Sequence, residues 1–273
     1  MSIANWRYTI LAAALSIMVL GSSNLGWGLG LLSIAVPVAW LWYFSLRFSG
    51  SSNVESDAAK PTPTLYWPVA LCFAVSVAIA PAFVFTAELL NKGFAAAAAG
   101  SQLLYFVLRA GLVEESLKIA AVLIVLKYLA AGAVRHPKDG MVLACAAALG
   151  FSAYENLYHN LYLVQLETGA AQAFFLGALV RVPLHALYAS VWGTPLGLSR
   201  FMKPSARYIV LTLGLIPAAF LHGLWDTLAQ SRGTEVGVEL TLLYGALWLS
   251  YWHTWKRSQA IKLGTEQASD NQV

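Results

Sequence analysis

The stretch AGLVEESLKIAAVLIVLKYL, from Ala110 to Leu129, decides how the rest of this chain is interpreted. It is long and apolar enough to cross a membrane as a helix, yet it carries Glu114, Glu115 and Lys118. Ionisable side chains are costly inside a bilayer, and where they occur they usually serve a function. The stretch therefore predicts a membrane helix with a functional site on one face.

The composition of the whole chain also indicates a membrane protein. Of its 273 residues, 59% are hydrophobic and 11% are charged, whereas a soluble domain carries about 25% charged residues. The apolar residues come in blocks of about 20, the length that crosses the hydrocarbon core as a helix. We expect an all-α, polytopic integral membrane protein that forms a single membrane domain over residues 1–273.

Eight segments are predicted to span the bilayer: Tyr8–Leu20, Leu25–Leu46, Leu65–Leu89, Gln102–Leu129, Gly140–Gln165, Ala171–Leu198, Tyr208–Leu228 and Val236–Trp255. Twelve Lys and Arg residues fall on the side that holds both termini, and only Lys92 and Arg232 fall on the other. By the positive-inside rule, the N and C termini are expected in the cytoplasm, with the protein in the inner membrane.

The same rule explains the net charge of +4 without nucleic acid as a partner, leaving the lipid bilayer as the expected surroundings. Residues 47–64 are rich in Ser, Pro and charge and are expected to form a cytoplasmic linker. Residues 263–273 are expected to be a disordered tail. The segment Asn91–Ser101 fits either a surface helix or the start of the next span.

Four consecutive predicted spans each carry two titratable residues spaced four apart: Glu114 and Lys118, Glu155 and His159, Arg181 and His185, and His222 and Asp226. Residues at this spacing share one helix face. A single polar cluster is expected, because each isolated charge would cost several kcal/mol in hydrocarbon. For three of these residues a purely structural role is the alternative. His159 would be a packing residue, Lys118 a partner for Glu114, and Asp226 a group that orients His222.

Carboxylates and imidazoles around a wet pocket suit general acid and base catalysis on a water molecule. A glutamate can take a proton from water and return it to a leaving amine, while His185 or His222 positions the water or stabilises the oxyanion. Histidine and glutamate are also zinc ligands, although the HExxH motif is absent. No GxSG serine motif occurs, and Asp226 has no second aspartate within the spans.

Four short motifs resemble those of a known family: EESLK (Glu114–Lys118), FSAYEN (Phe151–Asn156), RVPLH (Arg181–His185) followed by Gly193, and HGLWD (His222–Asp226). Each motif alone is weak, but four in this order in successive spans are specific. They resemble the PrsW family of intramembrane proteases, which is related to the CAAX prenyl endopeptidase and bacteriocin-processing superfamily. The resemblance covers residues 102–230, the expected catalytic helical core.

The resemblance implies an intramembrane endopeptidase of glutamic or metal-dependent type, whose substrate is a membrane-anchored protein such as an anti-sigma factor. It implies catalytic roles for Glu114, Glu115, His185 and His222. It implies supporting roles for Lys118, Glu155, Asn156, Arg181 and Asp226. Zinc is the candidate cofactor, with His185, His222 and Glu155 as its candidate ligands. Either Glu114 or Glu115 can be the base on this interpretation.

Two other classes of function fit the polar spans. In a proton-coupled transporter or channel, the same Glu, His and Arg residues would relay protons, although the chain shows no internal repeat. In a non-catalytic membrane scaffold, the polar cluster would serve helix association alone. Cleavage, flux and stability of the glutamate variants distinguish the three hypotheses.

Overall fold

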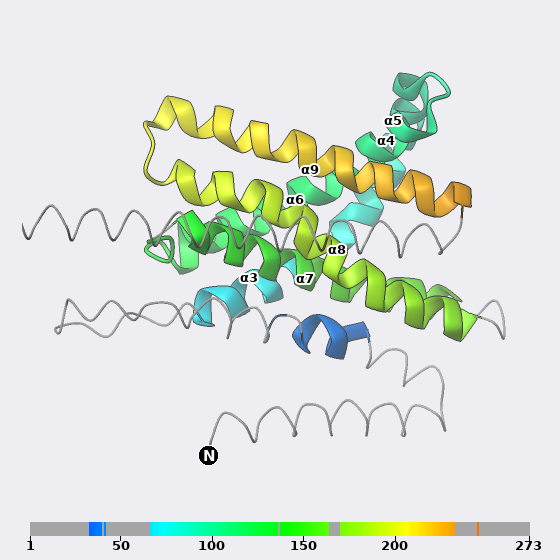
Figure 1. The fold of residues 1–273 in the computed structure, drawn as a ribbon, viewed down its shortest axis with the longest axis horizontal. Helices are drawn as coiled ribbons and strands as arrows, with labels where there is room; N and C mark the ends of the chain where they lie inside the picture. Colours follow the sequence, from blue (N-terminus) through cyan, green and yellow to red (C-terminus); the bar gives the residue numbers. More distant parts are fainter. Residues whose placement is uncertain are drawn as a thin grey trace, which may run out of the picture.

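The computed structural model of the protein describes residues 33–39, 41, 66–135, 137–163, 170–232 and 245. Its elements run α3 (Tyr66–Ile79), α4 (Pro81–Ala98), α5 (Gln102–Phe106), the π-helical segment η1 (Val107–Leu112), α6 (Val113–Ile124), the π-helical segment η2 (Val125–Leu129), α7 (Pro137–Leu163), α8 (Ala170–Ser199) and α9 (Pro204–Arg232) (Figure 1). The all-α prediction is therefore confirmed for the described residues.

Several predicted segments lie outside this part of the chain. They are the span Tyr8–Leu20, the linker 47–64, the tail 263–273, and all of the span Val236–Trp255 except Gly245. Of the span Leu25–Leu46, only residues 33–39 and 41 are described, and they are helical. Three predictions thus stay predictions: the count of eight spans, the boundaries of the catalytic core, and the location of both termini in the cytoplasm.

The described helices match the later predicted spans closely. Helices α8 and α9 cover two of them, α7 covers Gly140–Gln165 as far as Leu163, where the described residues stop, and the elements from α5 to η2 cover Gln102–Leu129. The predicted span Leu65–Leu89 differs, because the helical axis bends by 42° between α3 and α4 and α4 continues to Ala98. Pro81, which cannot donate a backbone hydrogen bond, begins α4 at this bend. Most of the segment Asn91–Ser101, up to Ala98, therefore forms the last turns of α4.

Two described helices, residues Pro137–Tyr158 and Pro204–Gln230, are long and apolar enough to cross a membrane, and the bent pair α3–α4 would be a third span. The surface of α9 agrees with such a setting. Ile209, Leu213, Ile216 and Phe220, three or four positions apart, are exposed along one face. An apolar stripe that no described helix covers is what a helix presents to lipid.

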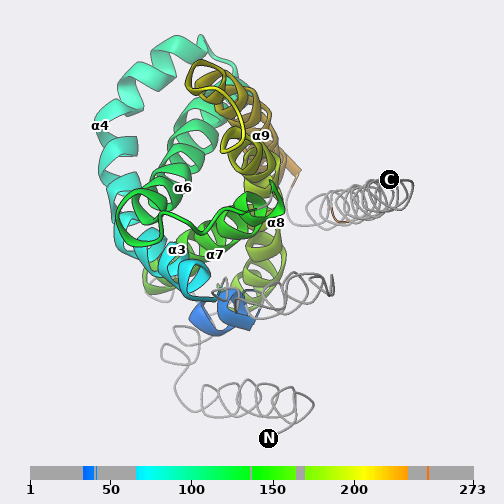
Figure 2. The same cartoon turned by 90° about the vertical axis from the view of Figure 1, so that its left-hand side faces the viewer.

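Helix α7 occupies the centre of the described bundle, where it packs against α3, α6 and α8. Its residues from Met141 to Leu149 are all buried, and most of them are Ala or Cys. Small side chains let neighbouring backbones approach closely, which is how membrane helices gain packing energy. Figure 2 shows α4 at the edge of the bundle and α9 on the far side of α6 from α3.

Helix α9 also packs against η1, the segment that leads into α6. A side chain at Gly111 would collide with the backbone carbonyl of Ala219, and one at Gly223 would collide with the backbone of Val107. These two glycines hold the start of α6 directly against the middle of α9. The contact brings the glutamates of α6 close to His222.

Candidate active site

The inner face of α6 carries the first three polar residues of the site. Glu114, Glu115 and Lys118 are buried together with Ala121 and Val122. The opposite face of α6 exposes Leu123 and Ile124. The π-helical turn of η1 immediately precedes this helix, and π-helical turns often occur at functional sites. Helix α6 is therefore amphipathic, with its charged residues facing the bundle and apolar residues on its exposed side.

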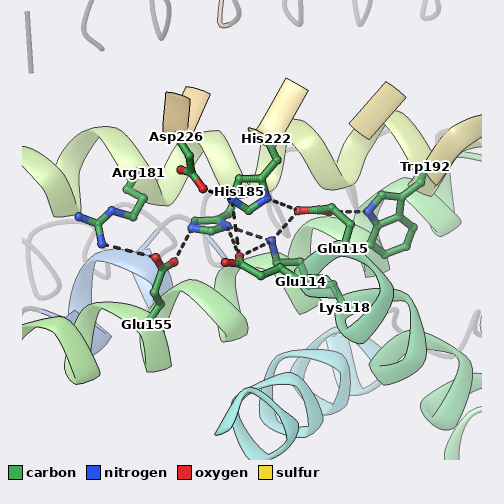
Figure 3. A network of polar contacts seen from close by, with 9 residues as sticks. All are labelled: Glu114, Glu115, Lys118, Glu155, Arg181, His185, Trp192, His222 and Asp226. Atoms are coloured by element: carbon green, nitrogen blue, oxygen red, sulfur yellow. Dashed lines mark hydrogen bonds and ion pairs between the residues drawn. The ribbon is translucent and has the colours of Figure 1, made fainter. Parts of the chain in front are cut away.

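Lys118 lies at the centre of the cluster (Figure 3). Its Nζ is 2.6 Å from Oε1 of Glu115, 2.9 Å from Nδ1 of His185 and 3.5 Å from Oε2 of Glu114. An ammonium group can only donate hydrogen bonds. Nδ1 of His185 must therefore accept, which places the proton of a neutral His185 ring on Nε2.

Glu115 is bound on both of its oxygens. Oε1 accepts from Lys118 and lies 3.0 Å from Nδ1 of His222, while Oε2 accepts from Nε1 of Trp192 at 2.8 Å. These donors come from three helices, and the side chain is fully buried. An ionised carboxylate only accepts, so Nδ1 of His222 carries a proton. Glu115 thus ties α6, α8 and α9 together.

Glu114 differs from its neighbour. Its Oε2 lies 3.5 Å from Lys118 Nζ, 3.6 Å from His222 Nε2 and 4.0 Å from His185 Nδ1, and it makes no hydrogen bond within the described residues. The carboxylate is nevertheless buried. It is the acid of α6 that has a buried oxygen open to a water molecule, a substrate or a cation.

Glu155 of α7 joins the centre to the more exposed side of the cluster. Its Oε2 is 2.7 Å from Nε2 of His185, although the two groups are not aligned for a hydrogen bond, and its Oε1 is 3.6 Å from Nη1 of Arg181. The Glu155 side chain is 17% exposed and that of Arg181 is 29% exposed. Exposure thus rises from His185 outward through Glu155 to Arg181.

His222 of α9 lies next to the carboxylate of Glu114. Its Nε2 lies 3.6 Å from Glu114 and 4.0 Å from Oδ2 of Asp226, whose side chain is 28% exposed. The ring of Tyr188 stacks on it at 4.8 Å, and the His185 ring stands edge-on to it at 5.2 Å. This packing fixes the imidazole with Nε2 directed at Glu114.

The structure brings eight of the nine predicted site residues into one cluster: Glu114, Glu115, Lys118, Glu155, Arg181, His185, His222 and Asp226 (Figure 3). Asn156 is buried on α7, but its amide Nδ2 makes no hydrogen bond in the described part of the chain. The side chain of His159 lies outside the described residues.

Sequence analysis missed two residues of this cluster, Trp192 and Tyr188. Both are aromatic, so neither stood out against the apolar spans. A signal was available, because Tyr188 and Trp192 follow His185 by three and seven positions, and residues at these spacings share a helix face. Helix α8 therefore presents Arg181, His185, Tyr188 and Trp192 to the cluster.

Three members of the cluster can hold a metal ion. One ligand atom each from Glu114, His185 and His222 lie within 4.8 Å of one another, and all three residues are buried. Two imidazoles and a carboxylate form a typical ligand set of catalytic zinc, and the open oxygen of Glu114 suits a cation. The donor types fit, provided that Lys118 withdraws from His185. Glu155, predicted as the carboxylate ligand, instead approaches the other ring nitrogen of His185.

Two known proteins are similar to this chain, and both carry the name of the family that the four motifs resemble. The Protease PrsW of Bacillus subtilis (strain 168) is 34% identical over 141 residues, which cover 52% of this chain and 61% of that protein. The Protease PrsW of Geobacillus kaustophilus (strain HTA426) is 34% identical over 115 residues, covering 41% of this chain and 47% of that protein. The matched segments thus span less than two thirds of either relative. No solved structure matches the chain significantly.

A family model covers more of the chain than either relative does. It matches residues 61–252, which is more than half of the sequence and includes every residue of the cluster. The resemblance found in the four motifs is therefore confirmed. The chain belongs to the PrsW family, described as intramembrane metalloproteases.

Proposed function

We propose that this chain is an intramembrane endopeptidase that hydrolyses a peptide bond of a membrane-anchored protein with a glutamate-activated water molecule. The observation that carries the proposal is the contrast between the two glutamates of α6. Glu115 is bound by donors on both oxygens, whereas buried Glu114 has an open oxygen facing His222. Glu114 is therefore the base, and Glu115 is the anchor of the site.

The reaction begins when Glu114 takes a proton from water and the water oxygen bonds to the substrate carbonyl carbon. The negative charge on the carbonyl oxygen is then stabilised by nearby donors. Lys118 Nζ lies 3.5 Å from Glu114, and Nε2 of His222 lies 3.6 Å from it and donates when both ring nitrogens of His222 carry a proton. Glu114 returns the proton to the amide nitrogen, the carbon–nitrogen bond breaks, and the amine leaves. His185 and Lys118 hold the carboxylates in place.

If the site binds a divalent ion, Glu114, His185 and His222 would hold it, with zinc as the candidate and Glu155 as an alternative ligand. Such an ion supplies a Lewis acid that polarises a carbonyl group and makes bound water more acidic. The supporting observations are the family description and the ligand types present.

The position of the site supports the proposed class of substrate. Buried catalytic groups within apolar helices are reached from the bilayer, so a single-span or otherwise membrane-anchored protein is the expected substrate class. An anti-sigma factor is the example that the resemblance to the PrsW family implies. The inner membrane, with both termini in the cytoplasm, is the proposed location.

Cleavage by purified protein tests the proposal. The wild type, Glu114→Gln and the matched control Glu88→Gln are incubated in liposomes with a broad library of single-span proteins, and products are identified by mass spectrometry. Glu88 is an exposed acid of α4 away from the cluster. We expect the wild type and Glu88→Gln to cleave alike, and Glu114→Gln to lose about 10²- to 10⁴-fold in rate.

A zinc chelator added to the wild type separates the two chemical types. Retained cleavage supports a glutamate acting without a metal, and cleavage lost and restored by added zinc supports a metal ion at the candidate ligands Glu114, His185 and His222. Normal cleavage by folded Glu114→Gln contradicts the proposal. Proton-coupled flux through wild-type liposomes without cleavage would favour the transporter hypothesis instead.

A further inference from the structure

Trp192 is the donor to the second oxygen of Glu115. Its indole Nε1 donates to Oε2 at 2.8 Å, and both side chains have exposed fractions of 0%. The two residues are 77 positions apart in sequence and belong to α8 and α6. This hydrogen bond is therefore a specific long-range contact of the site and has no part in the reaction described above.

The buried indole and the buried carboxylate each need the other as a hydrogen-bond partner. An indole has one N–H group and no acceptor, so a buried tryptophan needs a partner of just this kind. A buried carboxylate in turn needs donors on both oxygens, and hydrogen bonds to charged groups are stronger than neutral ones. With Oε2 bound by Trp192, Oε1 is left for Lys118 and His222.

The helix backbone at Trp192 is tightly packed against α9. Gly214 of α9 lies against it, since a side chain there would place its Cβ 2.9 Å from Cα of Trp192. The missing side chain of Gly214 lets α9 approach α8 at this level. His222 lies two helical turns further along α9, so the same close contact positions two of the three donors of Glu115, Trp192 and His222.

We propose that Trp192 is a positioning residue of the active site, which acts through Glu115 to hold His222 and Lys118 relative to Glu114. This inference rests on the proposed endopeptidase function. Loss of the indole N–H leaves Oε2 without its donor and allows the carboxylate to turn. His222 and Lys118 then lose their fixed distances to Glu114, whereas the exposed surface is unchanged because Trp192 is fully buried.

The first experiment compares the kinetics of wild type, Trp192→Phe and the control Trp67→Phe. Phenylalanine retains most of the packing and removes the N–H, and Trp67 is an exposed tryptophan of α3. We expect Trp192→Phe to lower kcat about 10- to 100-fold, as is typical of groups that orient catalytic residues. KM should stay close to wild type, and the melting temperature should fall by several degrees, because a buried carboxylate oxygen loses its donor. Trp67→Phe should behave as wild type.

A second experiment does not depend on catalysis. The indole ¹H–¹⁵N signal of Trp192, assigned through its own backbone signals, is recorded in detergent for the wild type, Glu115→Gln and Glu88→Gln. A hydrogen bond to an ionised carboxylate shifts this signal and slows its exchange with water. We expect Glu115→Gln to move the signal and speed its exchange, and Glu88→Gln to change neither.

These readouts separate this inference from the proposed function. If the wild type cleaves nothing, the endopeptidase proposal fails, while the indole signal still tests the bond. A folded Trp192→Phe variant with wild-type kcat overturns the positioning role. An indole signal that ignores Glu115→Gln also overturns it, even where Trp192→Phe does not fold.

Discussion

At the scale of single residues, the pair Lys118 and Glu115 holds opposite charges together in a fully buried place. Removing charges from water costs several kcal/mol per ion, and only close pairing with further hydrogen bonds offsets that cost. The additional bonds from Trp192 and His222 to Glu115 meet this condition. The pair is therefore expected to be sensitive to loss of either member.

Replacing Lys118→Met leaves the Glu115 carboxylate buried without its cation. We expect the free energy of unfolding to fall by about 3–5 kcal/mol, the usual cost of breaking a buried ion pair from one side. The double variant Lys118→Met with Glu115→Gln should recover part of this loss, because neither charge remains. Equilibrium unfolding in detergent measures both effects.

The exposed Lys127 is the matched control, and Lys127→Met should change stability by less than about 0.5 kcal/mol. If the double variant is less stable than Lys118→Met alone, the two side chains do not stabilise each other through their charges. An equal loss in Lys127→Met would assign the effect to the new methionine.

Which acid Lys118 pairs with most closely was not predictable from spacing. Glu114 is four positions away and Glu115 three, and both spacings place side chains together on a helix. The structure selects Glu115 as the closer partner, because His222 and Trp192 fix that carboxylate from other helices. The residues of the cluster were predicted well, but the division of labour between the glutamates depends on long-range contacts.

At the scale of helices, the site depends on the contact between η1 and α9. Adding a methyl group at Gly111 forces it against the carbonyl oxygen of Ala219, which belongs to a rigid helix backbone. We expect Gly111→Ala to lower stability by about 1–3 kcal/mol, as overpacking usually does. Cleavage should fall as well, since the α6 glutamates move away from His222.

The control for this prediction is Gly93→Ala in α4, where an added Cβ meets no atom within 4 Å. There the change should stabilise the helix by about 0.5–1 kcal/mol. Melting temperatures and cleavage rates of the two variants in the same detergent give the comparison. Equal behaviour of Gly111→Ala and Gly93→Ala would show that η1 and α9 are not in close contact.

Sequence patterns predicted the later helices to within a few residues but not the irregular ones. Runs of apolar residues mark α7, α8 and α9 clearly, and the proline in the middle of the third predicted span was the signal for the bend at Pro81. The π-helical turns of η1 and η2 carry no composition of their own. They are defined by hydrogen bonds between residues five positions apart, which no residue type marks in the sequence.

At the scale of the whole molecule, the ends of the helices lie at two levels. Figure 1 places the turn between α8 and α9 and the turn between α4 and α5 at opposite ends of the bundle. The first turn carries Arg200 and Lys203, which the positive-inside rule assigns to the cytoplasm. The orientation of the molecule can therefore be tested at these two turns.

Single cysteines introduced at exposed positions give this test, with Ser205→Cys near the first turn and Ala97→Cys near the second. The native Cys72 and Cys145 are buried and should add little background. We expect a membrane-impermeant maleimide to label Ala97→Cys in intact cells, and Ser205→Cys only after the cells are opened. The reverse pattern would invert the proposed topology.

The long separation between partners in the cluster has a consequence for biosynthesis. Glu115 meets Lys118 within its own helix, but its other donors, Trp192 and His222, follow 77 and 107 residues later. Since a chain is made from its N-terminus, α6 leaves the ribosome long before those donors exist. Until they are made, Lys118 is the one of these three donors that Glu115 has, and we expect chains that stop before α9 to be less stable than the finished protein.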